Sequence, residues 1–336
     1  MAASKGISKL SLFHIPFEPH AQLCDELILE DNGAASRLLR KTQGKQWLPG
    51  QPRISLDSKD LIPYVQSEFL TPRLDRLSSY LWLVATQSSS HISPLHDQIV
   101  RGRNVVISEK PELHLVWHDT KVFLKPIPSY CFSHDFWRFV FDSELSPRFP
   151  AHEREGLLQA VRGYMRSYYY LIRHESDFRI AREEHLLPDG VEWEEFASFI
   201  SGFANVVDDE ASARYHFGEL RLARLNLWAK IVLHQWQFQK TSWQYGDYFA
   251  RLFAPILFLF GALSVALSAM QVGVGARPSW EAFQSASAWF SVVTLVIICI
   301  ITFMLVGAFA FMSVRELNFA VKDIFRKSRK PQLTSC

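Results

Sequence analysis

The sequence reads LFAPILFLFGALSVALSAM from Leu252 to Met270 and WFSVVTLVIICIITFMLVGAFAFM from Trp289 to Met312. A helix rises about 1.5 Å per residue, so both runs are long enough to cross the roughly 30 Å hydrocarbon core of a bilayer. Neither run contains a charged residue, and a helix that is apolar on every side does not suit a soluble domain. We therefore predict a transmembrane hairpin over residues 246–314, with helices over 252–272 and 288–312.

Basic residues set the expected orientation of this hairpin. The loop between the helices carries only Arg277, which Glu281 offsets, whereas Lys and Arg gather before the first helix and after the second. Because loops rich in Lys and Arg stay in the cytosol, we expect a multi-pass membrane protein with both termini cytosolic. The sequence leaves the choice of membrane open.

A basic cytosolic tail follows the hairpin, over residues 315–336. Each basic residue near an anionic bilayer surface contributes roughly 1 kcal/mol of attraction. The residues expected at the membrane surface are Arg326, Lys327, Arg329 and Lys330.

Small residues recur at a spacing of four in the first apolar run, as Ala262 with Ala266 and Ser264 with Ser268. Small side chains allow two transmembrane helices to approach closely, so we predict helix packing at these four positions and a homo-oligomer formed through the hairpin. Ordinary transmembrane composition explains the same pattern equally well.

The chain before the hairpin is predicted to be α+β. Residues 1–60 contain scattered prolines and no sustained period, so we expect a poorly ordered segment there. A mainly helical cytosolic domain is expected over 61–245. Its small antiparallel sheet would use strands at 104–108, 112–118 and 121–127, with a turn at Asp119-Thr120. Apolar residues at spacings of three and four predict helices over 153–185, 193–203 and 220–236.

Four stretches carry a resemblance that covers roughly residues 60 to 330. They read LDRLSSYLWLVATQSSSHISPLHDQIVRGRNVVISEKPELHLVWH (Leu74–His118), YYYLIRHESDFRIA (Tyr168–Ala181), RYHFGELRLARLN (Arg214–Asn226) and LSVALSAMQVG (Leu263–Gly273). In this order they resemble an uncharacterised family of fungal integral-membrane proteins of unknown function. The resemblance implies location and architecture only. Some members are labelled as subtilisin-like serine proteases.

That protease label is not supported by the residues. Ser90-His91 followed by His96-Asp97 offers the residue types of a catalytic triad. No glycine occurs between Gly50 and Gly102, however, and no G-x-S-x-G nucleophile turn occurs anywhere. A polar loop with a helix cap explains the serines, so we predict no catalytic residues.

Histidines suggest a metal site, with His91, His96 and His134 as candidate ligands. His114 and His118 would lie roughly 13 Å apart on one strand, at about 3.3 Å per residue, which is too far to share one zinc ion. We favour histidines at the rim of a sheet that bind the backbone, and we predict no metal and no cofactor. Arg101-Gly102-Arg103 offers a phosphate or lipid-headgroup site, but a turn explains it without a ligand.

Charge and cysteine content exclude some further classes. The 36 basic and 34 acidic residues give a net charge of +2, and no nucleic-acid-binding motif occurs, so we expect no nucleic acid. Four scattered cysteines without a C-x-x-C pair predict no disulfide framework.

Three functions remain open. We favour a non-enzymatic, membrane-anchored scaffold or interaction protein, whose partners are the lipid bilayer and a protein bound by the cytosolic domain. A channel or transporter of the CorA type is the second, although the Gly-Met-Asn of that family is replaced by Ala-Met-Gln-Val-Gly at 269–273. A membrane-bound serine hydrolase is the third.

Overall fold

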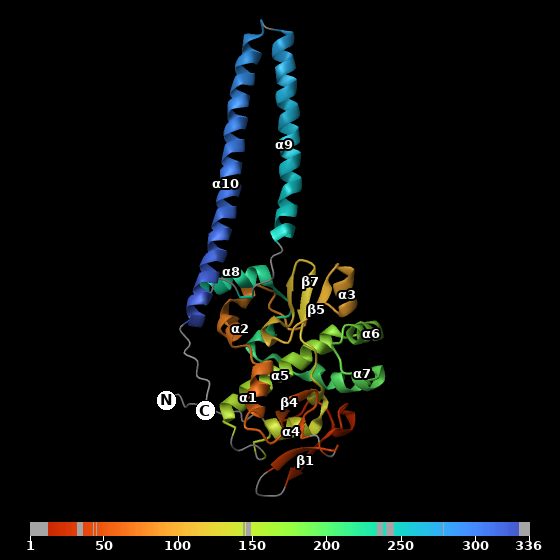
Figure 1. Ribbon diagram of the computed structural model, residues 1–336. Helices are drawn as coiled ribbons and strands as arrows, with labels where there is room; N and C mark the ends of the chain where they lie inside the picture. Colours follow the sequence, from red (N-terminus) through yellow and green to blue (C-terminus); the bar gives the residue numbers. More distant parts are fainter. Residues whose placement is uncertain are drawn as a thin grey trace, which may run out of the picture. The chain divides into compact units, whose positions relative to one another are not determined.

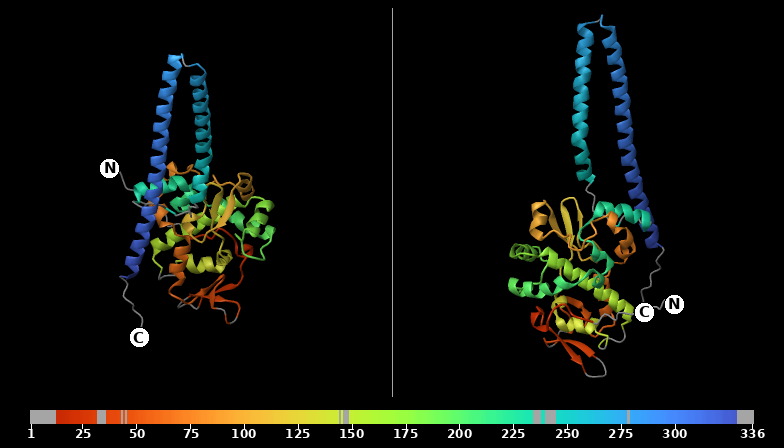
Figure 2. Two further views of the ribbon diagram at one scale, coloured as in Figure 1. Left: turned by 45° about the horizontal axis from the view of Figure 1, so that its top comes forward. Right: turned by 180° about the vertical axis from the view of Figure 1, so that it is seen from behind.

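The computed structural model describes residues 13–31, 36–42, 44, 46–143, 145, 149–233, 238–239, 245–277 and 279–328. The chain forms two compact units, residues 1–240 and 241–336 (Figures 1 and 2). The first unit holds short sheets and several helices, and the second holds two long helices.

The first unit is mainly helical, as predicted. Its strands are β1 (Leu27–Asp31), β2 (Ser36–Arg40), β3 (Trp47–Leu48), β4 (Gln51–Ser55), β5 (Asn104–Ile107), β6 (Val116–His118), β7 (Lys121–Leu124) and β8 (Leu220–Arg221). Its helices are α1 (Leu61–Phe69), α2 (Pro72–Leu77), α3 (Leu95–Val100), α4 (His134–Phe141), α5 (Ala151–Leu171), α6 (Glu175–Glu183), α7 (Trp193–Ser201) and α8 (Leu222–Val232). The short 3-10 helix η2 (Ser78–Leu83) follows α2 directly.

The largest sheet has four strands in the order β5-β7-β6-β8 and is mixed, whereas the sequence predicts an antiparallel one. Strands β6 and β7 do form the predicted antiparallel hairpin, with His118 opposite Lys121. The turn uses Asp119, whose positive φ of 52° suits a tight two-residue connection. The pairs β5–β7 and β6–β8 are parallel, so β5 and β8 flank the hairpin on its two sides.

The helix predicted over 153–185 is two helices, α5 and α6. The helix ends where the carboxylate of Asp177 accepts hydrogen bonds from the backbone N–H groups of Arg173 and His174, at 3.1 and 3.0 Å. This contact caps the start of α6 and holds the chain out of helical geometry between the two helices. Helices α7 and α8 form within the other two predicted ranges.

The expectation of a poorly ordered segment over residues 1–60 is corrected for the part that the structure describes. Strands β1 and β2 form one hairpin and β3 and β4 another. Phe17, Leu27, Leu38 and Leu48 are buried in the same core as α5. The ring of Phe17 lies 4.7 Å from that of Phe199, between ring centroids. Buried aromatic area of this kind holds short strands that have little local propensity.

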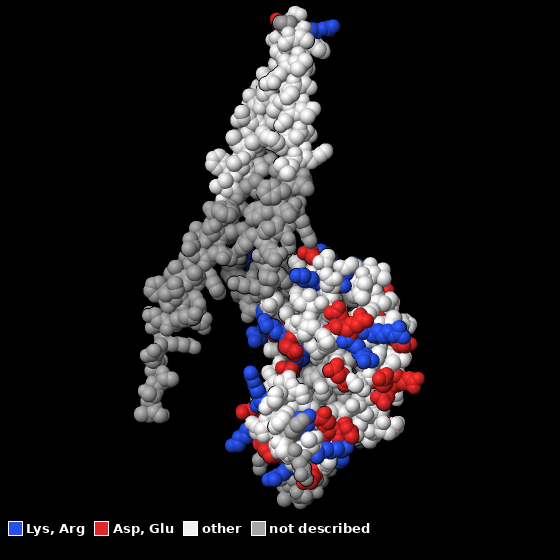
Figure 3. Space-filling view, turned by 45° about the vertical axis from the view of Figure 1, so that its right-hand side comes forward, with Lys and Arg blue, Asp and Glu red and all other residues white. Residues whose placement is uncertain are grey.

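The second unit consists of α9 (Tyr245–Ala276) and α10 (Glu281–Ser328), which pack against each other. Both helices run beyond the predicted spans, and their stretches Leu257–Ala276 and Glu281–Met304 are long and apolar enough to cross a membrane. Their apolar side chains point outward, with Phe258 and Phe303 each 79% exposed. The part of this unit coloured white in Figure 3 is almost free of charged side chains except at its tip.

Candidate functional site

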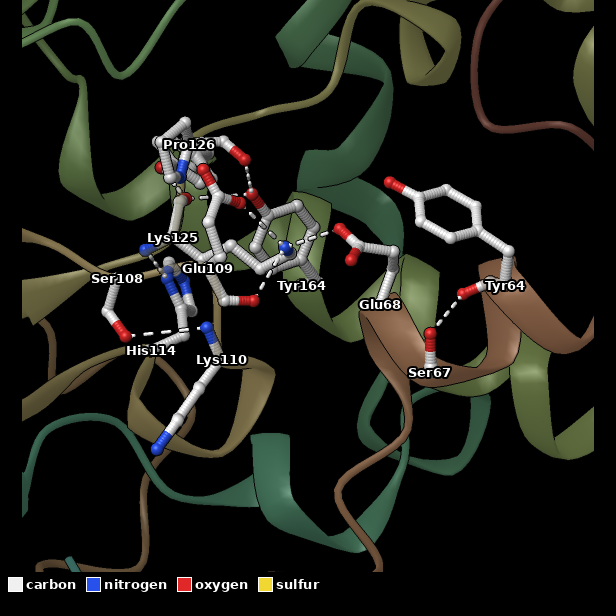
Figure 4. Close-up of polar contacts among 11 residues, drawn as sticks. Tyr64, Ser67, Glu68, Ser108, Glu109, Lys110, His114, Lys125, Pro126 and Tyr164 are labelled. Carbon is white, nitrogen blue, oxygen red and sulfur yellow. Dashed lines mark hydrogen bonds and ion pairs between the residues drawn. The ribbon is translucent and has the colours of Figure 1, made fainter. Parts of the chain in front are cut away.

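A cluster of ionisable and hydrogen-bonding side chains surrounds Lys125, the residue that follows β7 (Figure 4). Its side chain is 0% exposed. The Nζ atom donates to Glu68 Oε2 at 2.6 Å and to the backbone oxygen of Glu109 at 2.9 Å, and it lies 3.3 Å from Glu109 Oε2. Two carboxylates and a carbonyl therefore replace the water that a buried ammonium loses.

Local structure explains how Lys125 and Glu68 meet. Strand β7 buries Val122 and Leu124 and ends at Leu124, and the next residue, Lys125, is also fully buried. Helix α1 buries Val65 and Phe69 on its inner face, and Glu68 lies at the edge of that face. The ammonium thus meets a carboxylate at the margin of the core.

The backbone of Lys125 is bound as tightly as its side chain. Its carbonyl oxygen accepts hydrogen bonds from the hydroxyls of Tyr164, at 2.9 Å, and Tyr168. Its N–H donates to His114 Nδ1 at 3.2 Å. Both tyrosines belong to α5, so the hydrogen bonds of Lys125 link the end of β7 to α5.

His114 and Ser167 have the spacing of a catalytic base and nucleophile, with Nε2 and Oγ 2.7 Å apart. The directions of the hydrogen bonds oppose that role. Because Nδ1 accepts from Lys125, Nε2 carries the ring proton and donates to Ser167 Oγ. The Ser167 hydroxyl in turn donates to the Tyr164 carbonyl at 2.6 Å. The histidine has no free lone pair with which to activate this serine.

Burial keeps this histidine neutral. Loss of water lowers the pKa of His114 well below its usual value, and the nearby cations Arg214 and Lys125 lower it further. Arg214 is itself buried, which lowers its pKa to about 10. Its guanidinium donates to the carbonyl oxygens of Phe217, Gly218 and His114, at 2.8, 3.1 and 3.0 Å. The cluster is therefore a polar cross-link inside the core, and its groups bind one another.

A groove of about 410 Å³ lies beside this cluster. It is formed by the second half of α1 and the segment after β5, which also carry Glu68 and Glu109. Its lining residues are Gln66, Ser67, Leu70, Pro72, Lys110, Pro111 and Glu112. Lys125 and His114 are not among them, so the groove has no direct access to the buried ammonium or imidazole.

His96, one of the three candidate metal ligands, binds Asp177 instead. Its Nδ1 lies 2.7 Å from Asp177 Oδ1, and its Nε2 lies 3.4 Å from Asp97 Oδ1. Burial raises the pKa of Asp177, but hydrogen bonds from His96, His174 and Arg173 outweigh burial and lower the pKa overall. Both ring nitrogens lie against carboxylates, and the described residues show no hydrogen bond from this ring to a serine, so the triad suggested by Ser90-His91 and His96-Asp97 is not formed around this histidine.

The other two candidate metal ligands lie in separate surroundings. The ring of His134 at the start of α4 packs edge-on against Phe17, and the backbone oxygen of His91 accepts from the N–H of Glu219 at 3.3 Å. Within the ranges that the structure describes, no group of three or more His, Cys, Asp or Glu residues is arranged to hold a metal ion. Sequence proximity did not bring His91, His96 and His134 into one site.

Arg103 of the candidate Arg101-Gly102-Arg103 site is already bound. Its guanidinium donates to Glu219 at 2.6 Å and to Gln98 at 2.8 Å, and it lies 4.1 Å from the centre of the Trp117 ring. Gly102 has a φ of +70°, which is typical of the turn that the sequence predicts.

The predicted packing residues of the hairpin lie on α9. Ala262, Ser264 and Ser268 are exposed and Ala266 is half-buried. A groove of about 730 Å³ between α9 and α10 is lined by none of these four residues. The residues of α9 that line it are Leu267, Met270, Gln271 and Val274. Arg326 and Lys327 lie in the last turns of α10, where side chains are not described, and Arg329 and Lys330 lie outside the described residues.

A family model with the description "Family of unknown function (DUF6601)" matches residues 61–298, more than half of the chain. The chain belongs to this family. The matched range begins where α1 begins, so it contains the Lys125 cluster and α9 but leaves out β1 to β4. No curated protein and no solved structure matches the chain.

The buried cluster was not among the residues predicted from sequence. The sequence around Lys125 predicts only the end of a strand. Its partners Glu68 and Glu109 lie 57 and 16 residues away along the chain. The available signal was a lysine placed between two apolar residues, Leu124 and Ile127, with only Pro126 intervening.

Proposed function

We propose that this protein is an integral membrane protein whose hairpin crosses a bilayer twice, with both termini in the cytosol. The observation that carries the proposal is the exposure of large apolar side chains along α9 and α10. Exposed residues of the two helices include Leu257, Phe258, Phe260, Val265, Leu295, Ile300, Phe303 and Met304. Contact with lipid removes this apolar surface from water, whereas burial inside the protein covers 0% of the span Leu257–Ala276 and 11% of the span Glu281–Met304.

We further propose that the first unit is a non-enzymatic scaffold that binds a protein partner in the cytosol. Support comes from the chemistry of its polar clusters, in which Lys125, His114 and Asp177 bind other residues of the chain. Such groups stabilise a rigid domain rather than react with a substrate. The description of the matched family names no activity.

Membrane fractionation tests the first proposal. The full chain is expected to stay with membranes after washing with alkaline carbonate and to dissolve only in detergent. An Asn-x-Ser acceptor inserted beside Trp280 is expected to be glycosylated, while tags at both termini are digested by protease outside sealed microsomes. A chain that stays in the supernatant after lysis and ultracentrifugation without detergent would exclude a membrane-spanning hairpin.

Proximity labelling tests the scaffold role. A labelling enzyme is fused to the full chain and, as the matched control, to residues 241–336 alone. The full chain is expected to label a set of neighbours that the control does not. Identical sets would contradict a partner-binding domain, and covalent capture of a serine by a serine-reactive probe would replace the scaffold with a hydrolase.

A further inference from the structure

Helix α8 has an apolar and basic outer face. Its inner face buries Leu222, Leu225 and Ala229 in a second core of the first unit. The opposite face exposes Leu227, at 56%, and Ile231. Arg224 and Lys230 are exposed on the same helix, and no acidic residue occurs between Leu222 and Val232. An amphipathic helix with apolar and cationic exposed positions is typical of the water–lipid interface.

Aromatic side chains of η2 extend this face. Trp82 is 61% exposed and Tyr80 is exposed beside it. The ring of Tyr80 stacks on that of Trp228 of α8, with centroids 6.3 Å apart and ring planes 11° apart. This stack joins elements that are separated by more than a hundred residues, and Trp82 follows Tyr80 by two residues in η2. We call the following set the α8 face: Tyr80, Trp82, Arg224, Leu227, Trp228, Lys230 and Ile231.

The chain itself keeps the α8 face near a bilayer if α9 spans one. Only residues 233–244 lie between the end of α8 and the start of α9. Twelve residues reach at most about 40 Å when fully extended. An anionic surface attracts the cations of the face, and Trp and Tyr favour the headgroup region.

We propose that the α8 face rests on the anionic headgroups of the membrane in which the hairpin is anchored. This inference rests on the proposed transmembrane hairpin. Contact through Trp82, Leu227 and Ile231 fixes which side of the first unit points away from the bilayer. The strands β1 and β2, which Figures 1 and 2 place at the end of this unit opposite α8, then point toward the cytosol and its proteins.

Lipid quenching in the full chain tests the contact. A cysteine is placed at Trp82→Cys, and in a separate protein at Leu227→Cys, in a background with Cys299→Ala and Cys336→Ser. The matched control is Glu30→Cys, an exposed residue of β1. Each cysteine carries a bimane dye, and the chains are reconstituted into phosphatidylcholine vesicles with or without one fifth phosphatidylserine. Headgroup-nitroxide lipid is the quencher, and thermal unfolding confirms that the variants are folded.

Quenching at positions 82 and 227 is expected to exceed that at position 30 at least twofold in vesicles with phosphatidylserine. It is expected to fall toward the control when phosphatidylserine is left out or when Arg224→Glu and Lys230→Glu are combined. Equal quenching at all three positions overturns the proposal and leaves the face to a protein partner. Quenching that does not depend on phosphatidylserine overturns the anionic part.

The same preparation separates the two proposals. Vesicles are washed with carbonate and floated on a density gradient before the measurement. Chains that do not float with the vesicles contradict the transmembrane hairpin itself. Chains that float but show no quenching at positions 82 and 227 contradict only the α8 face.

Discussion

Lys125 uses its side chain and its backbone for different partners. The ammonium binds Glu68 and Glu109, while the peptide groups bind His114 and two tyrosines of α5. The side chain of Lys125 is fully buried, whereas the carboxylates of Glu68 and Glu109 stay partly exposed. The ammonium therefore loses more of its hydration on folding than the carboxylates do. Such pairs add little net stability, but removal of one partner is costly.

Replacement of this lysine is expected to destabilise the first unit. Lys125→Met keeps most of the aliphatic stem but leaves the carboxylate of Glu68 without its cation. We expect a loss of about 3 kcal/mol in the free energy of unfolding, near the low end for buried pairs because the carboxylates can regain water. Unfolding in mild detergent, followed by tryptophan fluorescence, measures it. Lys121→Met, at an exposed position of β7, is the control, and equal stability of the two variants would contradict the expectation.

We expect the burial of His114 to make the folded chain less stable in acid. Its pKa is lowered well below 6.5 in the folded chain, so between the two values the unfolded chain binds a proton that the folded chain does not. Stability is therefore complete above pH 6.5 and falls as the pH falls below it. Between pH 7.5 and pH 5.5 this residue can remove at most about 1.4 kcal/mol, the limit set by an unfolded-state pKa of about 6.5.

Thermal unfolding at the two pH values tests this dependence. His114→Gln is expected to be less stable than the natural chain at pH 7.5 but to lose less on acidification. His152→Gln, at a side chain that is 85% exposed, is expected to keep the full dependence. An unchanged pH dependence in His114→Gln would exclude this residue as its source.

At the scale of elements, α5 organises the first unit. It contacts α1, α4 and α7, and its buried side chains belong to the same core as Leu27 and Leu38 of the N-terminal strands. The end of α7 shows how closely these parts approach. A Cβ added at Gly202 would lie 2.0 Å from the backbone oxygen of Pro16. Only a residue without a side chain allows the segment around Phe17 to pass there.

Substitution at this crossing is expected to loosen the N-terminal segment. Gly202→Ala forces the backbone of Pro16 away from α7 and is expected to cost about 1–3 kcal/mol of unfolding free energy. Gly156→Ala in α5 has open space around the new methyl group and is expected to be neutral or stabilising by about 0.5–1 kcal/mol. Limited proteolysis of residues 13–60 and thermal unfolding both report the effect. Identical cleavage in the two variants would show that Pro16 does not pack against Gly202.

At the scale of the whole molecule, the two units present different surfaces. The first mixes acidic and basic side chains over its surface, as Figure 3 shows, and keeps its large apolar residues mostly inside. The second exposes apolar side chains along both helices. One polypeptide therefore carries a charged surface on its first unit and, in α9 and α10, an apolar surface long enough to cross a membrane.

A charge in the middle of α10 tests the lipid environment directly. Ile300 is exposed on this helix, and Ile300→Arg is expected to make insertion less favourable by about 2.5–3.5 kcal/mol. The fraction of the chain that resists alkaline carbonate should fall, whereas Ile300→Leu should leave it unchanged. Equal carbonate resistance of the two variants would argue that α10 does not cross the hydrocarbon core.

Features that depend on neighbouring residues were predictable. The two long apolar helices follow from unbroken runs without charge, and the β6–β7 hairpin follows from alternation around Asp119-Thr120. Helices α7 and α8 follow from apolar spacing alone. In each case the interactions that fix the element are local, so the sequence by itself determined them.

Tertiary structure decided the rest. The N-terminal strands are held by Phe17 against Phe199, and the break between α5 and α6 is fixed by Asp177, whose carboxylate also binds His96 from 81 residues away. The Lys125 cluster and the parallel pairing of β6 with β8 likewise join distant segments. No local pattern marks such partners, because the free energy of each contact exists only once the chain has brought both sides together.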